Sequence, residues 1–323
     1  MNLPRRQFLH LAAAAAVLPT SVRAQAYPSR PVKMIIGQAA GSATDTVGRL
    51  VANFLSERLG QQFIVEAKPG AAGNIATEAF VRMPPDGYSL MVVNSQNAIN
   101  MALYEKLNFD FVRDVAPIGR VQRVPLVMVV NASVPANSLP EFIAYAKANP
   151  GKVNIASAGI GGPQHIAAEL FKFMAGLDLT HVPYRGTTPA VTDLIAGQVQ
   201  VMFDVTPTAL PQIKAGKVRP LGVSTMERLP FLPDVPTVDS FLKGYEVLAW
   251  IGIGAPKGTP PEIIALLNKQ TNALVLDPTF KKRMNDLGAE AVPPNSPDEF
   301  AKFIAENIDK WTQLIKHAGI KPQ

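Results

Sequence analysis

One order of elements occurs twice along this chain: a short apolar strand, a loop of small residues and an amphipathic helix, followed by a second strand, loop and helix. The two first loops are residues 37–45 and 157–163, and their glycines Gly41 and Gly159 lie 118 positions apart. Gly70 and Gly186, in the second loops, lie 116 positions apart. Two offsets this similar are typical of chains built from two similar units. We therefore predict two domains of like topology, each with a glycine loop between its first strand and its first helix.

The rest of the chain alternates β-branched runs with helical apolar patterns, which predicts an α/β fold in which helices flank a sheet in each domain. Two extended apolar segments, 125–131 and 246–256, join the halves and predict a two-strand hinge. The expected domains are 27–125 with 249–323, and 126–248. The predicted strands are 33–36, 63–65, 88–93, 153–156, 179–183 and 199–205, and the predicted helices are 47–59, 74–82, 166–175, 189–196, 260–276 and 297–317.

Composition narrows the possible chemistry. The chain has 323 residues, of which 47% are hydrophobic and 17% charged, and this is the composition of an ordinary globular protein that can build sizeable cores. The chain contains no cysteine. That absence excludes thiol catalysis, thiolate metal sites, iron–sulfur clusters and disulfide frameworks.

The first 24 residues have the features of an export signal. Arg5 and Arg6 precede the apolar run 9–18, which is too short to span a bilayer core of about 30 Å, and Val22-Arg23-Ala24 offers a small-residue cleavage site. Arg5-Arg6-Gln7-Phe8-Leu9 resembles a twin-arginine export motif, although Pro4 stands where a polar residue is usual. The alternative is a buried N-terminal helix, but such a helix rarely has a pair of arginines before its apolar run and a proline, here Pro19, directly after it.

Charge and hydropathy set expectations for location and partners. Loss of the three arginines of the signal lowers the formal net charge from +6 to +3, and no Lys/Arg tract remains. We therefore expect no nucleic-acid partner. No later apolar run has the length of a membrane span, so we expect a protein that is not embedded in a membrane and that lies free in the periplasm.

The loops 37–45 and 157–163 are the strongest candidates for a ligand site. Each places backbone N–H groups at a helix N-terminus beyond the carboxyl end of a strand, where helix dipole and free donors favour an anion. Small side chains let a ligand approach the backbone. Two such sites that face each other across a hinge would hold a ligand with carboxylates at both ends. The alternative is that the small residues only form tight turns and caps.

Each of four side chains near these loops could either bind the ligand or have only a structural role. His165 opens the second loop's helix and could donate a hydrogen bond to a ligand; Arg185 could pair with a carboxylate or be a solvated loop charge. Asp45 and Asp204 could orient loop N–H groups or a ligand amine, or could simply act as caps. The predicted ligand-binding residues are Gln38, Ala40, Gly41, Ser42, Thr44, Asp45, Ser95, Ser157, Ala158, Gly159, Gly161, His165, Tyr184, Arg185, Gly186 and Asp204.

Cofactor and metal binding are not expected. The run 159–162 (GIGG) matches half of a dinucleotide fingerprint, but Gln164 stands in place of the third glycine, which argues against a nucleotide. His165, His181 and His317 make no metal-binding spacing with one another. The predicted cofactor and metal sets are therefore empty.

Catalysis is the rival interpretation. A triad of Ser157, His165 and Asp193 is compatible with spacing, and Ser42 could replace Ser157 as the nucleophile of a serine-type hydrolase. Scattered polar residues supply such triples in most proteins, so we expect no enzyme. A third interpretation is an adaptor that binds no small ligand.

Seven segments, in order along the chain, resemble the periplasmic receptors of tripartite tricarboxylate transporters, also called Bug-type solute receptors. The segments are Tyr27–Val32 (YPSRPV), Lys68–Asn74 (KPGAAGN), Asp114–Gly119 (DVAPIG), Ser157–Gly161 (SAGIG), Val182–Gly186 (VPYRG), Pro233–Thr237 (PDVPT) and Ala255–Pro260 (APKGTP). The resemblance covers the chain from Tyr27 to its end.

The resemblance implies a two-domain periplasmic-binding-protein fold of type II-like form that closes on a small organic acid. Backbone groups and ordered water of the first loop (37–45), the Ser157 loop (157–163) and the Tyr184 loop (184–186) would hold the ligand. It implies a monomer that delivers its ligand to the membrane subunits of such a transporter; delivery to a signalling partner is the alternative. In the family the first loop usually carries prolines and an aromatic residue. Here 37–45 (GQAAGSATD) lacks both and Gln38 adds an amide, so the resemblance does not specify the acid.

Overall fold

The computed structural model describes residues 27–317, so the predicted export signal lies outside the described residues. The chain forms a ten-stranded sheet with the order β2-β1-β3-β9-β4-β7-β5-β6, in which β8 and β10 also pair with β4. The strands are β1 (Val32–Ile36), β2 (Phe63–Ala67), β3 (Ser89–Asn94), β4 (Val115–Asn131), β5 (Asn154–Ser157), β6 (Thr180–Pro183), β7 (Val201–Val205), β8 (Val218–Val223), β9 (Leu248–Pro256) and β10 (Glu290–Ala291).

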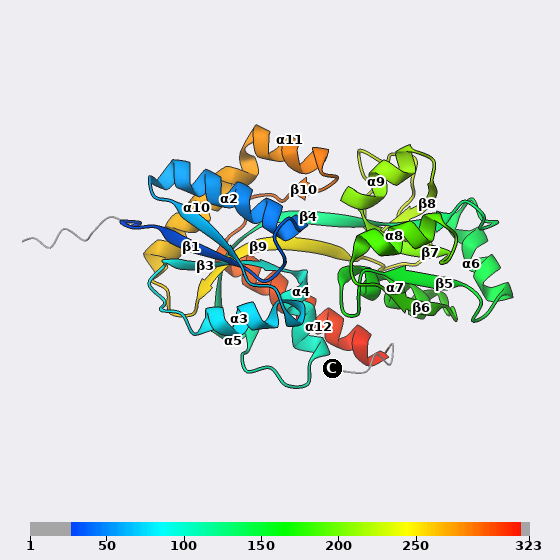
Figure 1. Ribbon diagram of the computed structural model, residues 1–323, viewed down its shortest axis with the longest axis horizontal. Coiled ribbons are helices and arrows are strands. Elements are labelled where there is room, and N and C mark those ends of the chain that lie inside the picture. Colours follow the sequence, from blue (N-terminus) through cyan, green and yellow to red (C-terminus); the bar gives the residue numbers. More distant parts are fainter. Residues whose placement is uncertain (1–26, 318–323) are drawn as a thin grey trace, which may run out of the picture.

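The sheet divides into two lobes, which Figure 1 shows side by side. Lobe 1 contains β1, β2, β3, β9, β10 and residues 115–125 of β4; lobe 2 contains residues 126–131 of β4 with β5, β6, β7 and β8. The α-helices are α2 (Ala43–Leu59), α3 (Asn74–Val81), α4 (Ser95–Leu103), α5 (Phe111–Asp114), α6 (Leu139–Ala148), α7 (Pro163–Ala175), α8 (Thr187–Ile195), α9 (Thr206–Lys214), α10 (Pro261–Leu276), α11 (Pro278–Asp286) and α12 (Pro297–His317). Among the described helices, none combines the length and the apolar character that crossing a membrane requires.

Parallel pairing brings the loops of each lobe to one edge. In lobe 1, β1 pairs in parallel with both β2 and β3, and in lobe 2, β5 pairs in parallel with both β6 and β7. The carboxyl ends of parallel strands meet at the same sheet edge, which is where α/β proteins bind ligands. The loops that follow β1, β2 and β3 therefore meet at one edge, and those that follow β5, β6 and β7 meet at the other.

Two cores cover the faces of lobe 1. Along β1, Met34 and Ile36 pack in a cluster with α2, α10 and α11, whereas Ile35 packs in a cluster with α3, α4 and α12. Burial of both faces explains why this strand is an uninterrupted apolar run and not an alternating one. The second of these clusters continues into lobe 2 through Phe171 of α7 and Phe203 of β7, so the two lobes share one layer of core.

The predicted strands and the predicted helices are confirmed to within a few residues. Gly60 and Gly176 end α2 and α7 in the left-handed region, at φ 70° and 61°, as helix-ending glycines commonly do. The structure adds elements that the apolar pattern did not indicate, namely α4, α5, α6, α9, α11, β8 and β10.

The predicted crossing segments are strands β4 and β9, and Ser224 ties them together. Ser224 follows β8, and its Oγ accepts a hydrogen bond from the Leu126 N–H (2.9 Å) and donates one to the Val247 carbonyl (2.6 Å). Its backbone also bonds to both residues, at 2.9 and 3.1 Å. A fully buried hydroxyl therefore holds the two crossing strands at a fixed spacing.

We expect the substitution Ser224→Ala to destabilise the fold by about 1–3 kcal/mol, because it leaves a buried N–H and a buried carbonyl without their side-chain partner. Urea unfolding followed by circular dichroism measures the effect. Thr312→Ala, which removes an exposed hydroxyl that bonds within α12, is the matched control and should change the free energy of unfolding by less than about 0.5 kcal/mol. Equal effects of both substitutions would contradict a stabilising role for the two hydrogen bonds of the Ser224 hydroxyl.

Candidate functional site

The loops of the two lobes are joined by a chain of hydrogen bonds. Asn94, the last residue of β3, donates through Nδ2 to Thr44 Oγ1 (3.3 Å), and its Oδ1 accepts from the Gln96 N–H (3.0 Å). Gln96 Nε2 then donates to the Gly161 carbonyl (3.0 Å). Gln96 lies in lobe 1 and Gly161 in lobe 2, so Asn94 and Gln96 connect the predicted loop of lobe 1 to the predicted loop of lobe 2.

Within lobe 2, the Ser157 loop and the Tyr184 loop are bonded to each other. The Tyr184 N–H donates to the Ser157 carbonyl (2.9 Å), and the Gly186 N–H donates to the Ala158 carbonyl (3.0 Å). Gly159 lies beside them at φ 146°, and a Cβ added there would lie 3.5 Å from the Tyr184 carbonyl. Five of the predicted ligand residues therefore lie together in these two neighbouring loops.

The helix N-terminus of lobe 1 is already occupied by the protein's own groups. Ser42 Oγ accepts from the Asp45 N–H (3.2 Å), and Asp45 Oδ2 accepts from the Gly41 N–H (2.9 Å) and from Arg49 Nε (3.0 Å). These hydrogen bonds, the one from Arg49 above all, hold the pKa of Asp45 below its ordinary value. In lobe 1, therefore, two of the loop's N–H donors, those of Gly41 and Asp45, are already bonded within the loop, and an ionised carboxylate lies beside them.

The corresponding helices of lobe 2 carry no such cap. The N-cap residues of α7 and α8 are Gly162 and Gly186, and neither has a side chain that could accept from the first turn. Arg185, immediately before Gly186, is exposed and makes no hydrogen bond or ion pair with other residues between 27 and 317. Two uncapped helix N-termini and a guanidinium give this edge of lobe 2 a positive potential.

The remaining predicted residues lie at the same two edges. Ala40 and Gly41 are exposed at the tip of their loop, and Ser95 is buried at the first position of α4. The amide nitrogen of Gln38 lies near Gly73, in the loop that follows β2. Oxygens of Gln38 and Asp45 are buried without a hydrogen-bond partner among the described residues, as is Asp204 Oδ1 in lobe 2.

The triad of the rival catalytic interpretation, Ser157, His165 and Asp193, is not assembled in the structure. Ser157 Oγ lies 2.7 Å from Nε2 of His181 and not from His165, and Asp193 accepts a hydrogen bond from the Tyr184 hydroxyl (2.7 Å). Burial, together with that carboxylate, raises the pKa of Tyr184 to about 12. Ser157 is 0% exposed, so its hydroxyl is not presented to a substrate.

Sequence reasoning missed a buried polar cluster under the Ser157 loop. His165, Glu169 and His181 place ring nitrogens and a carboxylate oxygen within 4.8 Å of one another, a proximity that the spacing of the histidines along the sequence did not indicate. Lys172 Nζ donates to both carboxylate oxygens of Glu169, at 2.9 and 3.0 Å, so this acid already has a cation as its partner. His165 and Glu169 are four positions apart on α7, which was a visible signal; the approach of His181 from β6 depends on the tertiary fold.

A pocket of about 260 Å³ lies away from these loops, between α7 and α12. Its lining is largely apolar and includes Leu170 and Trp311. None of the predicted ligand residues contributes to it.

Solved structures place the fold in a known class. The chain is similar to Rpa4515 of R. palustris, solved with adipate, with 34% identity and a TM-score of 0.82 over 92% of this chain and 100% of that chain. It is also similar to MatC of Rhodopseudomonas palustris, solved with bound malate, with 32% identity and a TM-score of 0.78 over 90% and 100% of the two chains. The fold is therefore the two-lobed α/β fold of periplasmic solute-binding proteins.

The family model for the tripartite tricarboxylate transporter family receptor matches residues 47–320. Protein BugT of Bordetella pertussis is 34% identical over 313 residues, which are 95% of each chain. The chain belongs to the tripartite tricarboxylate transporter receptor family, and the family resemblance predicted from its seven segments is confirmed.

The pH dependence of stability tests the burial of Asp204. This carboxyl is 1% exposed, accepts from Thr208 Oγ1 (2.6 Å), and has its pKa raised by burial to about 7. A raised pKa means that the neutral form stabilises the folded state at low pH and that this contribution is lost as the pH rises from about 4 through 7. Asp204→Asn should therefore increase the free energy of unfolding at pH 8 by up to about 4 kcal/mol and change it little at pH 4. Urea unfolding at both pH values measures this, and a gain independent of pH would contradict it.

Proposed function

We propose that this protein is a periplasmic receptor that captures a small organic carboxylate between its lobes and presents it to the membrane subunits of a tripartite tricarboxylate-type transporter. The observation that carries the proposal is the positive edge of lobe 2, where α7 and α8 begin without a cap beside Arg185. The relatives solved with adipate and with malate support a carboxylate ligand.

The two lobes contribute unequally to this proposed site. A carboxylate placed at lobe 2 gains about 0.3–1 kcal/mol from each helix dipole and about 1.5–3 kcal/mol from each charge-assisted hydrogen bond. Micromolar capture requires about −8 kcal/mol, which a few such contacts supply after the cost of closure. In lobe 1 the ionised Asp45 repels an anion, so its buried unpaired oxygen and that of Gln38 suit a hydroxyl, an ordered water or an ammonium group.

We assign residues 27–125 with 249–323 to one domain and 126–248 to the other, and we propose that they close about the crossing strands. The change of partner along β4 supports this boundary, because Pro125 pairs with β9 and Leu126 pairs with β7. The Gln96–Gly161 hydrogen bond supports a closed arrangement in which the loops touch. After removal of residues 1–24 the receptor would act as a monomer in the periplasm.

We propose binding without turnover, because the buried Ser157 hydroxyl is bonded to His181 and the Ser42 hydroxyl caps α2. A sensor that delivers the closed form to a signalling partner would use the same site and would differ only in that partner. Chromatography of adipate and malate after prolonged incubation with the protein should return both compounds unchanged.

Replacement of the loop guanidinium tests the proposed site. Arg185→Ala should weaken the binding of adipate or malate by about 10- to 100-fold, the loss of about 1.5–3 kcal/mol expected when one charge-assisted contact is removed. Isothermal titration calorimetry measures the change.

The matched control is Arg58→Ala, which removes the same charge from the last turn of α2, about 25 Å along the helix from its N-terminus. This control should bind with unchanged affinity. Equal affinities of the wild type and the Arg185 variant, or equal losses in both variants, would count against the anion site of lobe 2.

A further inference from the structure

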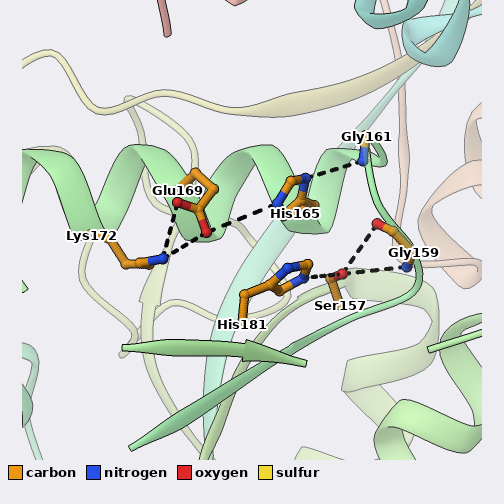
Figure 2. Close-up of polar contacts among 7 residues, drawn as sticks. All are labelled: Ser157, Gly159, Gly161, His165, Glu169, Lys172 and His181. Carbon is orange, nitrogen blue, oxygen red and sulfur yellow. Dashed lines mark hydrogen bonds and ion pairs between the residues drawn. The ribbon is translucent and has the colours of Figure 1, made fainter. Parts of the chain in front are cut away.

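Two histidines lie stacked beneath the Ser157 loop, on the side that faces the interior of lobe 2. His165 comes from the first turn of α7 and His181 from β6; their ring centroids are 4.2 Å apart and the rings are inclined by 25°. His165 is 4% exposed, so its ring is directed into the lobe and not toward a ligand. Figure 2 shows the pair between the loop on one side and Glu169 with Lys172 on the other.

Both rings bond to the loop. The Gly161 N–H donates to Nδ1 of His165 (3.1 Å), and Ser157 Oγ lies 2.7 Å from Nε2 of His181. Ser157 Oγ also accepts from the Gly159 N–H (3.3 Å). The loop is therefore attached to the histidine pair at both its ends (Figure 2).

The contact to Gly161 requires a neutral ring. An imidazole nitrogen that accepts a hydrogen bond from a backbone N–H carries a lone pair, so the proton of His165 is on Nε2. A doubly protonated ring has only donors and would oppose the Gly161 N–H. The carbonyl of Gly161 accepts a hydrogen bond from Gln96 of lobe 1. Loss of the His165 contact at the Gly161 N–H would therefore also affect this hydrogen bond between the lobes.

The charges around the pair also favour neutral rings. His165 Nε2 is 3.9 Å from Glu169 Oε1, but Glu169 is already paired with Lys172, so an added proton finds no unpaired anion. Glu169 and Lys172 of α7, with the two histidines themselves, are the titratable groups that face the pair among the described residues. The pKa of each histidine is lowered to about 4, mainly by burial; Lys172 contributes to the lowering for His165, and the proximity of His165 contributes to that for His181.

We propose that His165 and His181 are positioning residues for ligand binding: as neutral rings they hold the Ser157–Gly161 loop in its binding conformation, and a second proton on His165 releases the loop at Gly161. The inference rests on the proposed function, because it takes this loop as part of the ligand site. Its consequence is a receptor that binds its carboxylate at neutral pH and discharges it in acid through a change in the protein, in addition to any titration of the ligand.

The experiment compares affinities for adipate and malate at pH 7.5 and pH 4 by calorimetry. His165→Leu removes the acceptor of the Gly161 N–H, and His181→Leu removes the hydrogen-bond partner of Ser157 Oγ; each should weaken binding at least tenfold at pH 7.5. His165→Asn and His181→Gln place a neutral amide where Nδ1 and Nε2 lie and should restore most of that loss. Because a pKa of about 4 leaves His165 half protonated at pH 4, the double Asn/Gln variant should also lose about twofold less affinity than the wild type between pH 7.5 and pH 4; the titration of the ligand cancels in this ratio.

Two outcomes overturn the inference while leaving the proposed function intact: the same pH profile for the wild type and the double variant, or Leu variants that bind as tightly as the wild type at pH 7.5. If the wild type binds neither acid at pH 7.5, the proposed function fails instead. The positioning contact can then be measured separately by NMR of the free protein, in which the Gly161 amide resonance should shift with the midpoint of His165 protonation. An amide that ignores that protonation would overturn the inference.

Discussion

The passage of one strand through both lobes constrains the rest of the molecule. β4 pairs with β9 up to Pro125 and with β7 from Leu126 onward, so the two half-sheets share a backbone and cannot be rearranged independently. In each lobe the parallel strands place their following loops together at the carboxyl ends of the strands. Ser224 bonds to both crossing strands where they leave one lobe for the other. A fixed crossing point brings Gln96 of lobe 1 and Gly161 of lobe 2, which are 65 positions apart in the sequence, into hydrogen-bond contact.

The lobes repeat a topology but not an electrostatic role. In lobe 1, the first helix begins with a serine cap and an aspartate that is held ionised by Arg49. In lobe 2, the equivalent helix begins at a glycine, and its nearest polar side chains bond to the loop from beneath. One lobe thus supplies acceptors and the other supplies donors. An elongated acid with different groups at its two ends would be bound in a single orientation.

The sequence predicted the backbone of this site better than its side chains. Strands such as 33–36 and helix ends such as Gly60 depend on local patterns of burial and on backbone conformation, and both were predictable. The failures concern contacts between distant segments. Asp45 and Ser42 formed a recognisable cap, yet only the fold shows that they use the donors that an anion would need. Likewise, no spacing rule brings His181 against His165, because parallel pairing of β6 with β5 and the packing of α7 decide that contact. The helix that begins at Ser95 was missed because its polar first turn and short apolar face give little periodic signal.

The position of helix α12 allows a movement of the lobes to be followed by fluorescence. α12 belongs to lobe 1 by its contacts with α4 and β4, yet it also reaches α7 of lobe 2, and Trp311 lines the space between the two helices. Trp311 is 2% exposed, and the emission of an indole depends on its surroundings. Any displacement of one lobe against the other changes those surroundings. Under the proposed closure, the fluorescence of Trp311 would therefore report the movement of the lobes without an attached dye.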